Sequence, residues 1–384
     1  MLCCMFKSSR ATHVRKLWKL RVHHESRGEE ENADDIELKS IAHSVLKRLK
    51  EKQLESLVQS IELHGSENSQ CVMLPRGEIR IGKKVLTPLV LCCRMWRWDN
   101  VSPGTDLKRL SCCRGGDDPI YECCNPYHWS LLTEPDCEIT SGWSDVVKAK
   151  YTVDLDRPPD DPEEAVSMET GMTPTPRQEF SGSTSEDSNE GHHHSNMTSG
   201  VDPSLNTGQS SHGPHWCTVA YWELRERVGR LRTVFDKTYN IFQSLPLADG
   251  LCLDLLQSEP ESDSIRRTRE KIGFGVVLSK EGDGVWIYNR SQFPIFVNSP
   301  TLENPKTRTL YVHKVMPGYS LKIFDYTRAH LIVETCDPKV LDGPYDPNSI
   351  RVSFAKGWGR HYSRQFVTSC PCWLEIMLNI TEGR

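Results

Sequence analysis

Apolar positions change their period along the chain, and the change separates two kinds of predicted element. Over residues 34–63 they recur at helical spacing, with Lys and Glu on the opposite face, which predicts amphipathic helix. From Cys71 onward the apolar runs become short, and glycine and lysines between two of them predict a β-hairpin over 77–86. The apolar runs within 89–98 are interpreted as further strand. The first block, residues 29–150, is therefore predicted to be an α+β domain.

A second block, residues 215–380, carries short apolar runs at intervals of roughly ten residues, with turn residues between them. Strands are predicted at 219–223, 272–278, 285–288, 295–297, 310–312 and 320–324. This rhythm predicts a β-sandwich. Residues 325–332 favour a helix that Asp325 can cap. Gly273-x-Gly275 is interpreted as a bend, because it lacks the third glycine and the Lys-Ser/Thr of a phosphate loop.

Charge is distributed unevenly along the 384 residues. Residues 154–202 hold twelve Asp or Glu against two Arg, although the net charge of the whole chain is only −5. An acidic segment rich in proline and serine buries too little apolar surface to offset its ordering entropy. Residues 151–214 are therefore predicted to be a disordered acidic linker. Residues 1–28 are predicted to be a basic N-terminal tail that is solvated or binds importers and anionic surfaces.

Fifteen cysteines raise the question of disulfides. Several are adjacent pairs that cannot easily bridge to each other, and the apolar start of the chain is too short for a secretion signal. No run reaches the roughly 18 apolar residues that a membrane helix needs. We expect an intracellular protein with reduced cysteines, present in the cytoplasm and the nucleus. No nucleophile, base and orienting group can be named as a set, so an enzyme is not expected.

A group of cysteines and one histidine offers ligands for a metal. Cys123 and His128 stand five positions apart around an Asn-Pro turn, and Cys71 and Cys113 supply thiolates upstream. Three cysteines and one histidine make a closed, structural zinc set. The spacings differ from those of a standard zinc finger, so ordinary buried cysteines remain the alternative at this point.

Several motifs resemble those of the Smad family and occur in the family's order. They include Gln70-Cys-Val-Met-Leu-Pro-Arg76, Cys93-Arg-Met-Trp-Arg-Trp98, Cys123-x-Asn-Pro-Tyr-His128, Trp216-Cys-Thr-Val-Ala-Tyr-Trp-Glu223, Gly284-Val-Trp-Ile-Tyr-Asn-Arg290 and Lys356-Gly-Trp-Gly359. The resemblance implies an α+β N-terminal Mad-homology domain that binds one structural Zn²⁺. It also implies a C-terminal Mad-homology domain built as a β-sandwich with a helix bundle.

The family's zinc ligands match three residues of this chain directly, namely Cys71, Cys123 and His128. The fourth ligand lies where a gap must be placed in the comparison. We assign it to Cys113, with Cys112 as the alternative.

The resemblance also bears on DNA binding. In the family a β-hairpin reads bases in the major groove with an Arg, a Gln and a Lys, where this chain has Glu78, Arg80 and Val85. A carboxylate is repelled by phosphates and by the acceptor edge of guanine. Arg80, Lys83 and Lys84 can still contact the DNA backbone weakly. A solvated hairpin is nevertheless favoured.

The segment 351–378 resembles the loop and strand with which Smad proteins meet phosphorylated type I receptors. Its cations come from one loop, and clustered guanidinium groups grip phosphate with paired hydrogen bonds. The resemblance also implies that inhibitory members use a basic groove, which we place at Arg269, Lys271, Lys356 and Arg364. The candidate receptor-binding residues are Arg269, Lys271, Lys356, Arg360 and Arg364.

Activating members of the family end in a Ser-x-Ser tail, whereas the last serine here is Ser369. The leading hypothesis is therefore an inhibitory Smad that occupies type I receptor serine/threonine kinases of the TGF-β/BMP class and blocks receptor-activated Smads. The alternative is a nuclear transcriptional repressor that binds DNA through its zinc domain. Other Smads and transcription factors are expected partners. Ubiquitin ligases are in doubt, because Pro158-Pro159 is not part of a Pro-Pro-x-Tyr motif.

Overall fold

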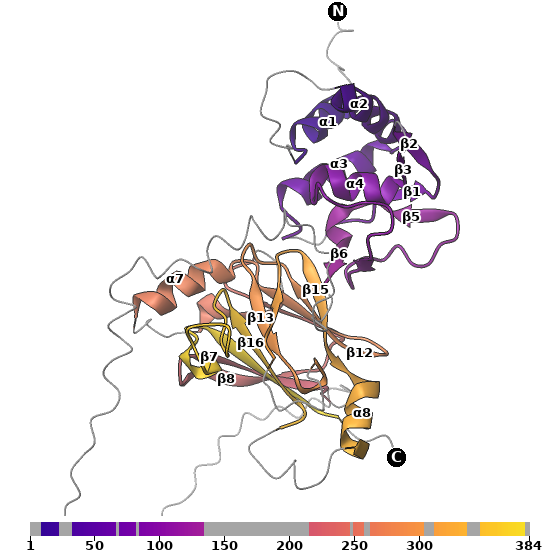
Figure 1. Ribbon diagram of the computed structural model, residues 1–384. Helices are drawn as coiled ribbons and strands as arrows, with labels where there is room; N and C mark the ends of the chain where they lie inside the picture. Colours follow the sequence, from indigo (N-terminus) through magenta and orange to yellow (C-terminus); the bar gives the residue numbers. More distant parts are fainter. Residues whose placement is uncertain are drawn as a thin grey trace, which may run out of the picture. The chain divides into compact units, whose positions relative to one another are not determined.

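The computed structural model describes residues 9–22, 33–66, 69–81, 84–133, 215–245, 249–256, 262–302, 311–335 and 346–380. They form an N-terminal and a C-terminal half (Figure 1). Each half has its own cluster of buried hydrophobic side chains. The predicted linker at 151–214 lies outside the described residues.

The N-terminal half contains the helices α1 (Ser9–Lys19), α2 (Ala33–Leu46), α3 (Glu51–Glu62) and α4 (Pro88–Trp96). The predicted helical stretch 34–63 is confirmed as two helices, α2 and α3, rather than one. Helix α3 buries Leu54, Leu57, Val58 and Ile61, which share one face at helical spacing.

Helix α1 corrects the prediction of a basic N-terminal tail over the residues that it covers. Val14 and Leu17 are buried in the N-terminal core, and the indole Nε1 of Trp96 donates a 2.9 Å hydrogen bond to the carbonyl of Leu17. The basic residues lie on the exposed side, where Lys16 pairs with Glu62 at 2.7 Å. Two apolar positions among many charges are a weak periodic signal, so this helix was not predicted.

Helix α4 is the second correction, because strand was predicted over 89–98. The hydroxyl of Thr87 accepts a 3.2 Å hydrogen bond from the amide of Val90, and Pro88 occupies the first helical turn. Every residue of α4 except Arg94 is buried. Periodicity cannot separate a fully buried short helix from a buried strand, so the Thr-Pro start was the informative signal.

Short strands complete the N-terminal half. Strand β1 (Met73–Pro75) pairs antiparallel with β5 (Tyr121–Cys123), and β4 (Leu107–Arg109) pairs with β6 (Trp129–Leu132). The predicted hairpin is confirmed as β2 (Ile79–Ile81) and β3 (Lys84–Leu86), with Arg80 opposite Val85.

Two sheets make up most of the C-terminal half. One has the order β14 (His313–Val315), β13 (Ile295–Asn298), β16 (Ser349–Phe354), β17 (Trp373–Leu378), β7 (Cys217–Glu223) and β8 (Glu226–Val234). The other includes β10 (Gly250–Cys252), β9 (Thr238–Phe242), β11 (Val276–Lys280), β12 (Gly284–Asn289) and β15 (Tyr319–Asp325), in that order. The prediction that this half is rich in strands is confirmed.

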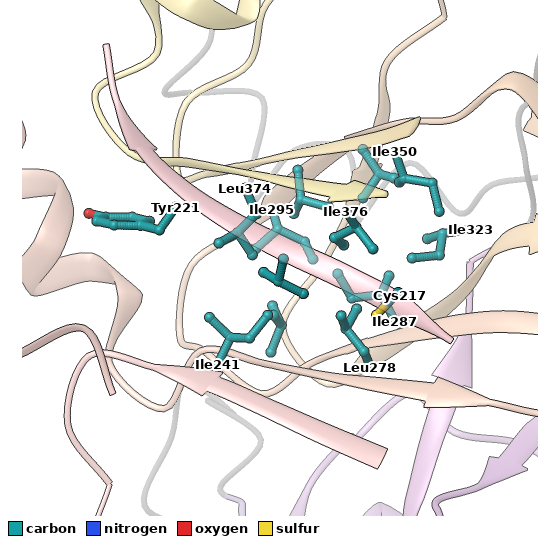
Figure 2. Close-up of a cluster of buried hydrophobic side chains, with 14 of the residues drawn as sticks. Cys217, Tyr221, Ile241, Leu278, Ile287, Ile295, Ile323, Ile350, Leu374 and Ile376 are labelled. Carbon is teal, nitrogen blue, oxygen red and sulfur yellow. The ribbon is translucent and has the colours of Figure 1, made fainter. Parts of the chain in front are cut away.

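The inward-facing side chains of both sheets form one core. Ile295, Ile350 and Leu374 come from one sheet, and Ile241 and Leu278 from the other (Figure 2). Tyr221 lies at the edge of this cluster, and its hydroxyl points away from the other labelled side chains (Figure 2). That hydroxyl belongs to a polar network that reaches helix α7.

Helix α7 (Asp263–Ile272) was not predicted, whereas α8 (Tyr326–Thr335) was. The capping role of Asp325 is confirmed, because its carboxylate accepts a 3.0 Å hydrogen bond from the amide of Arg328. Gly273 follows α7 with φ 51°, so the glycine pair marks a helix end rather than a bend within one strand. No helix within the described ranges combines the length and apolar character needed to cross a membrane.

Candidate metal centre and basic loop

Four side chains that are distant in sequence converge in the N-terminal half. The ligand atoms of Cys71, Cys113, Cys123 and His128 all lie within 4.8 Å of one another. Nδ1 of His128 is 3.5 Å from Sγ of Cys71 and 3.4 Å from Sγ of Cys123, and the sulfurs of Cys71 and Cys113 are 3.8 Å apart. Such a group could hold a metal ion, and three thiols with one imidazole match the donors that zinc prefers.

The local sequence explains how these side chains meet. Met73 pairs with Cys123 across β1 and β5, which brings the residues just before β1 close to the end of β5. Asn125 is fully buried, and its side-chain oxygen accepts a 3.1 Å hydrogen bond from the amide of Tyr127. This contact caps the 3₁₀ turn Pro126–His128, which returns His128 to Cys123. The Asn-Pro pair is therefore the structural reason for the short spacing.

The imidazole of His128 is oriented by the backbone. Its Nε2 lies 3.1 Å from the carbonyl oxygen of Ser69, which can only accept. Nε2 is therefore the protonated nitrogen, and Nδ1 directs its lone pair toward the sulfurs. This is the tautomer that a metal-binding histidine requires.

The thiols differ in how readily they ionise. A hydrogen bond from Cys123 does most to lower the pKa of Cys113, and His128 and the amide of Gly115 lower it further. Burial raises the pKa of Cys71, and the hydrogen bond to Cys113 raises the pKa of Cys123. The pKa of one thiol is therefore lowered, while the pKa values of the other two are raised. A divalent ion would supply the positive charge that the remaining ionisations need.

The two candidates for the fourth ligand are clearly separated. Cys113 lies in the group, whereas Cys112 is an exposed thiol outside it. Gly115 approaches the group closely, since a Cβ there would lie 3.2 Å from Cβ of Cys123 and 3.5 Å from Sγ of Cys113. A glycine at this position lets the segment after Cys113 pass over the sulfurs.

The candidate DNA-contacting residues lie on the β2–β3 hairpin. Glu78 and Arg80 are exposed, and Val85 is 38% exposed. Lys83 lies outside the described residues, and Lys84 is described only as part of β3. The hairpin thus presents an exposed carboxylate before β2 and an apolar side chain on β3.

The basic loop lies in the C-terminal half, between β16 and the 3₁₀ turn Val367–Ser369. Trp358 is 2% exposed, and a Cβ on Gly357 would overlap the ring of Tyr362. Gly359 has φ 96°, and its amide donates a 2.7 Å hydrogen bond to the carbonyl of Arg364. Gly357 is therefore required by its close packing against Tyr362, and Gly359 by its left-handed backbone conformation. These contacts fix the conformation of the loop.

Three cations come from this loop. Arg360 is exposed, while Lys356 and Arg364 are half-buried. Burial raises the pKa of the nearby thiol of Cys370, and the positive charges of Arg364 and Lys356 both act against that rise. Two cations eight positions apart in the sequence thus lie within electrostatic reach of one buried sulfur.

Helix α7 carries the other two candidates, and they differ from each other. The guanidinium of Arg269 forms two hydrogen bonds with Glu223, at 2.5 and 2.7 Å, and the hydroxyl of Tyr221 donates a third at 2.7 Å. The side chains of Glu223 and Arg269 are only 6% and 17% exposed. Lys271 lies over the ring of Phe293 with its Nζ 5.4 Å from the ring centre. Arg269 is thus engaged within the domain, a feature that the sequence did not reveal.

A groove of about 840 Å³ adjoins the loop, and sequence reasoning missed it. Trp222 and Trp373 stack in it, with ring centres 5.2 Å apart and planes at 10°. Trp358 and Phe366 also line it, and Phe366 is 65% exposed. The indole nitrogen of Trp222 is buried without a hydrogen-bond partner among the described residues. Alternation along β7 and β17 places both tryptophans on the outer face, which was the available signal.

Comparison with known proteins identifies the family to which the chain belongs. Residues 38–133 match the MH1 domain and residues 214–379 match the MH2 domain. The chain is 45% identical over 348 residues to Mothers against decapentaplegic homolog 6 of Gallus gallus, covering 89% of this chain and 75% of that protein. It is 39% identical over 363 residues to Mothers against decapentaplegic homolog 7 of Homo sapiens, covering 90% and 79%.

Among solved structures, the interferon regulatory factor 9 IAD domain aligns with 42% of this chain and 82% of that chain. The identity is 13% and the TM-score 0.31, a likeness too distant to bear on function.

An MH1 domain with a Cys₃His group and an MH2 domain with a basic loop define a two-domain Mad-homology protein. The chain belongs to the Smad family, and its similarity to homolog 6 places it with the inhibitory Smads. Both matched domains agree with the resemblance in the sequence motifs. No enzyme family appears among these matches.

Proposed function

We propose that this protein inhibits TGF-β/BMP-type signalling by binding activated type I receptor serine/threonine kinases, which blocks receptor-activated Smads. The basic loop is the proposed contact, with Lys356, Arg360 and Arg364 facing a phosphorylated receptor segment. Lys271 extends the basic surface along α7. Arg269 contributes mainly by fixing the position of α7, because Glu223 already occupies two of its N–H groups.

The observation that carries the proposal is a closed loop with three cations and no acidic side chain between Lys356 and Arg364. Buried Trp358 and the Gly359–Arg364 hydrogen bond hold the loop in one shape before any partner binds. A preformed set of cations loses little entropy when it binds phosphate, and each guanidinium can donate two charge-assisted hydrogen bonds. The adjoining tryptophan groove offers apolar surface beside the cations.

The test is the affinity of the full chain for a type I receptor kinase domain, phosphorylated and unphosphorylated. Loss of one charge-assisted contact costs about 1.5–3 kcal/mol, or roughly tenfold to a hundredfold in affinity. Lys356→Glu and Arg364→Glu should each weaken binding to the phosphorylated kinase by at least that factor. Arg230→Glu is the matched control, because Arg230 is an exposed arginine on β8 of the same domain. Equal affinities for the wild type and both loop variants would refute the proposed contact.

We further propose that the Cys₃His group binds one structural zinc ion. The donor set, the tautomer of His128 and the burial of Cys123 support this assignment. The ion would link β1, β5 and the segment around Cys113, and its role would be to stabilise the N-terminal domain. The proposed sites of action are the cytoplasm and the nucleus.

A further inference from the structure

Ser363 lies inside the basic loop and differs from its neighbours in how it is held. The side chain is exposed, and it makes no hydrogen bond within the described part of the chain. The backbone on either side is fixed, because the amide of Tyr362 donates to the carbonyl of Gly359 and the amide of Gly359 donates to the carbonyl of Arg364. A free hydroxyl is thus displayed on an ordered loop.

The residues around this hydroxyl suit an arginine-directed protein kinase. Arg360 stands three positions before Ser363 and is exposed, and Arg364 follows directly. Kinases of this class use acidic side chains beside the active site to bind an arginine at the third position before the acceptor hydroxyl. The loop is outside regular secondary structure, so opening it requires no strand to leave a sheet.

We propose that Ser363 is a phosphorylation site for an arginine-directed serine/threonine kinase, and that its phosphorylation prevents the loop from binding receptor phosphate. The Oγ of Ser363 attacks the γ-phosphorus of MgATP and loses its proton to the kinase base. The bond between the γ-phosphorus and the bridging oxygen breaks, and ADP leaves. This inference rests on the proposed receptor contact.

The charge balance explains the effect. The loop carries three positive charges, from Lys356, Arg360 and Arg364, and no carboxylate. A phosphoserine adds a charge of about −1.5 to −2 at neutral pH, together with three acceptor oxygens. The net charge of the loop falls to about +1, and the arginines beside Ser363 gain a phosphate within their own loop. A receptor phosphate would then meet a weaker positive charge, with arginines that the phosphoserine already engages.

The fold should survive the modification. Trp358 is buried, and Tyr362 packs edge-to-face on Phe296 with ring centres 5.3 Å apart. Neither contact involves the hydroxyl of Ser363. Phosphorylation therefore changes the charge of the loop and leaves its supports in place.

The first arm of the experiment asks whether Ser363 is an acceptor. The full chain is incubated with MgATP and, separately, with cyclic-AMP-dependent kinase, protein kinase C and calcium/calmodulin-dependent kinase, and phosphate is located by mass spectrometry. Thr233 is an internal control, since it also has an arginine three positions before it but is paired within strand β8. Phosphate at Ser363 is expected with at least one kinase. Absence of phosphate at Ser363 in all three reactions overturns the proposed site.

The second arm measures the effect on receptor binding. Full chains with phosphoserine encoded at position 363, or at the exposed position 369 as a matched control, are compared with the wild type and Ser363→Ala against a phosphorylated type I receptor kinase domain. Phosphoserine at 363 should lower affinity about tenfold or more, while the control and Ser363→Ala stay within about twofold of wild type. If the wild type binds and phosphoserine 363 does not weaken it, the inference fails. If the wild type itself does not bind, the proposed function fails instead.

Discussion

The ion pair between Arg269 and Glu223 allows a prediction that separates a structural role from a receptor contact. Arg269→Ala would leave the carboxylate of Glu223 at 6% exposure, with the hydroxyl of Tyr221 as its one remaining side-chain donor in the described part of the chain. Burial raises the pKa of Tyr221, and the charge of Glu223 raises it further, so that hydroxyl remains a donor. One donor cannot replace the two N–H groups that the guanidinium supplied.

The magnitude follows from how deeply the pair is buried. Removing one partner of a fully buried ion pair costs about 3–5 kcal/mol, because the other charge stays buried without compensation. Arg269 retains 17% exposure, so water can reach part of the site and the loss should lie at the lower end of this range or just below it. We expect a loss of about 2–3 kcal/mol, which for a domain of this size corresponds to a fall in Tm of roughly 5–10 °C.

The assay is calorimetry of the full-length chain, in which the unfolding transition of the C-terminal domain is followed. Arg266→Ala is the matched control on the same helix, because Arg266 pairs with Asp263 at 2.5 Å with side chains 59% and 56% exposed. Exposed pairs of this kind contribute about 0–1 kcal/mol. An Arg269→Ala variant no less stable than Arg266→Ala would refute the structural reading. Weakened receptor binding at unchanged stability would then assign Arg269 to the receptor surface.

Three further predictions concern other parts of the chain. Chelation, or Cys123→Ser, should remove about one zinc per chain and destabilise the N-terminal domain, while Cys112→Ser should leave the zinc content unchanged. Metal analysis and calorimetry measure these two effects. A metal-free domain that still unfolds cooperatively at the same temperature would contradict the prediction. The hairpin should bind DNA weakly and without specificity, and Glu78→Arg should strengthen this binding in a gel-shift titration; a specific nanomolar complex of the wild type at physiological salt would contradict it. The hydrogen bond with Lys322 lowers the pKa of Asp283. The pair therefore stabilises the folded protein above about pH 4, and this stabilisation is lost as the pH falls. Lys322→Met should therefore flatten the acid limb of the pH–stability profile, and an unchanged acid limb would show that the pair contributes nothing.

The sequence was most informative where local rules and packing agree. Short apolar runs at regular intervals predicted several strands of the C-terminal half, and Asp325 was correctly identified as a helix cap. The hairpin near Arg80 also formed as expected, since one glycine and one lysine separate β2 from β3 in the sequence. In these places each residue's own preference points to the same structure as the surrounding fold.

The predictions from sequence failed where complete burial removed the periodicity of apolar residues, or where many charged residues concealed it. Helix α4 is buried nearly all round, and α1 buries only two apolar side chains that are described. The ion pair of Arg269 depends on β7 and α7 meeting in space, which no local pattern announces. The sequence also left two candidates for the fourth metal ligand, because Cys112 and Cys113 are adjacent. The turn after Leu110 decides which of the two joins the metal group.

The basic loop combines strain with rigidity, and this combination bears on its function. Ala355 has φ 57°, a left-handed conformation that costs a non-glycine residue about 1–3 kcal/mol unless its surroundings maintain it. The amide of Ala355 donates to the carbonyl of Pro294, and the hydroxyl of Ser353 donates to the carbonyl of Lys356 at 2.7 Å. Strand contacts thus hold the start of the loop, and buried Trp358 holds its middle. Because backbone hydrogen bonds and the rings of Trp358 and Tyr362 set the shape, we expect that the cations of the loop can be changed or neutralised without unfolding the domain. A binding surface built in this way responds to charge alone, which is why charge reversal at Lys356 and a phosphate at Ser363 should alter receptor affinity in the same direction.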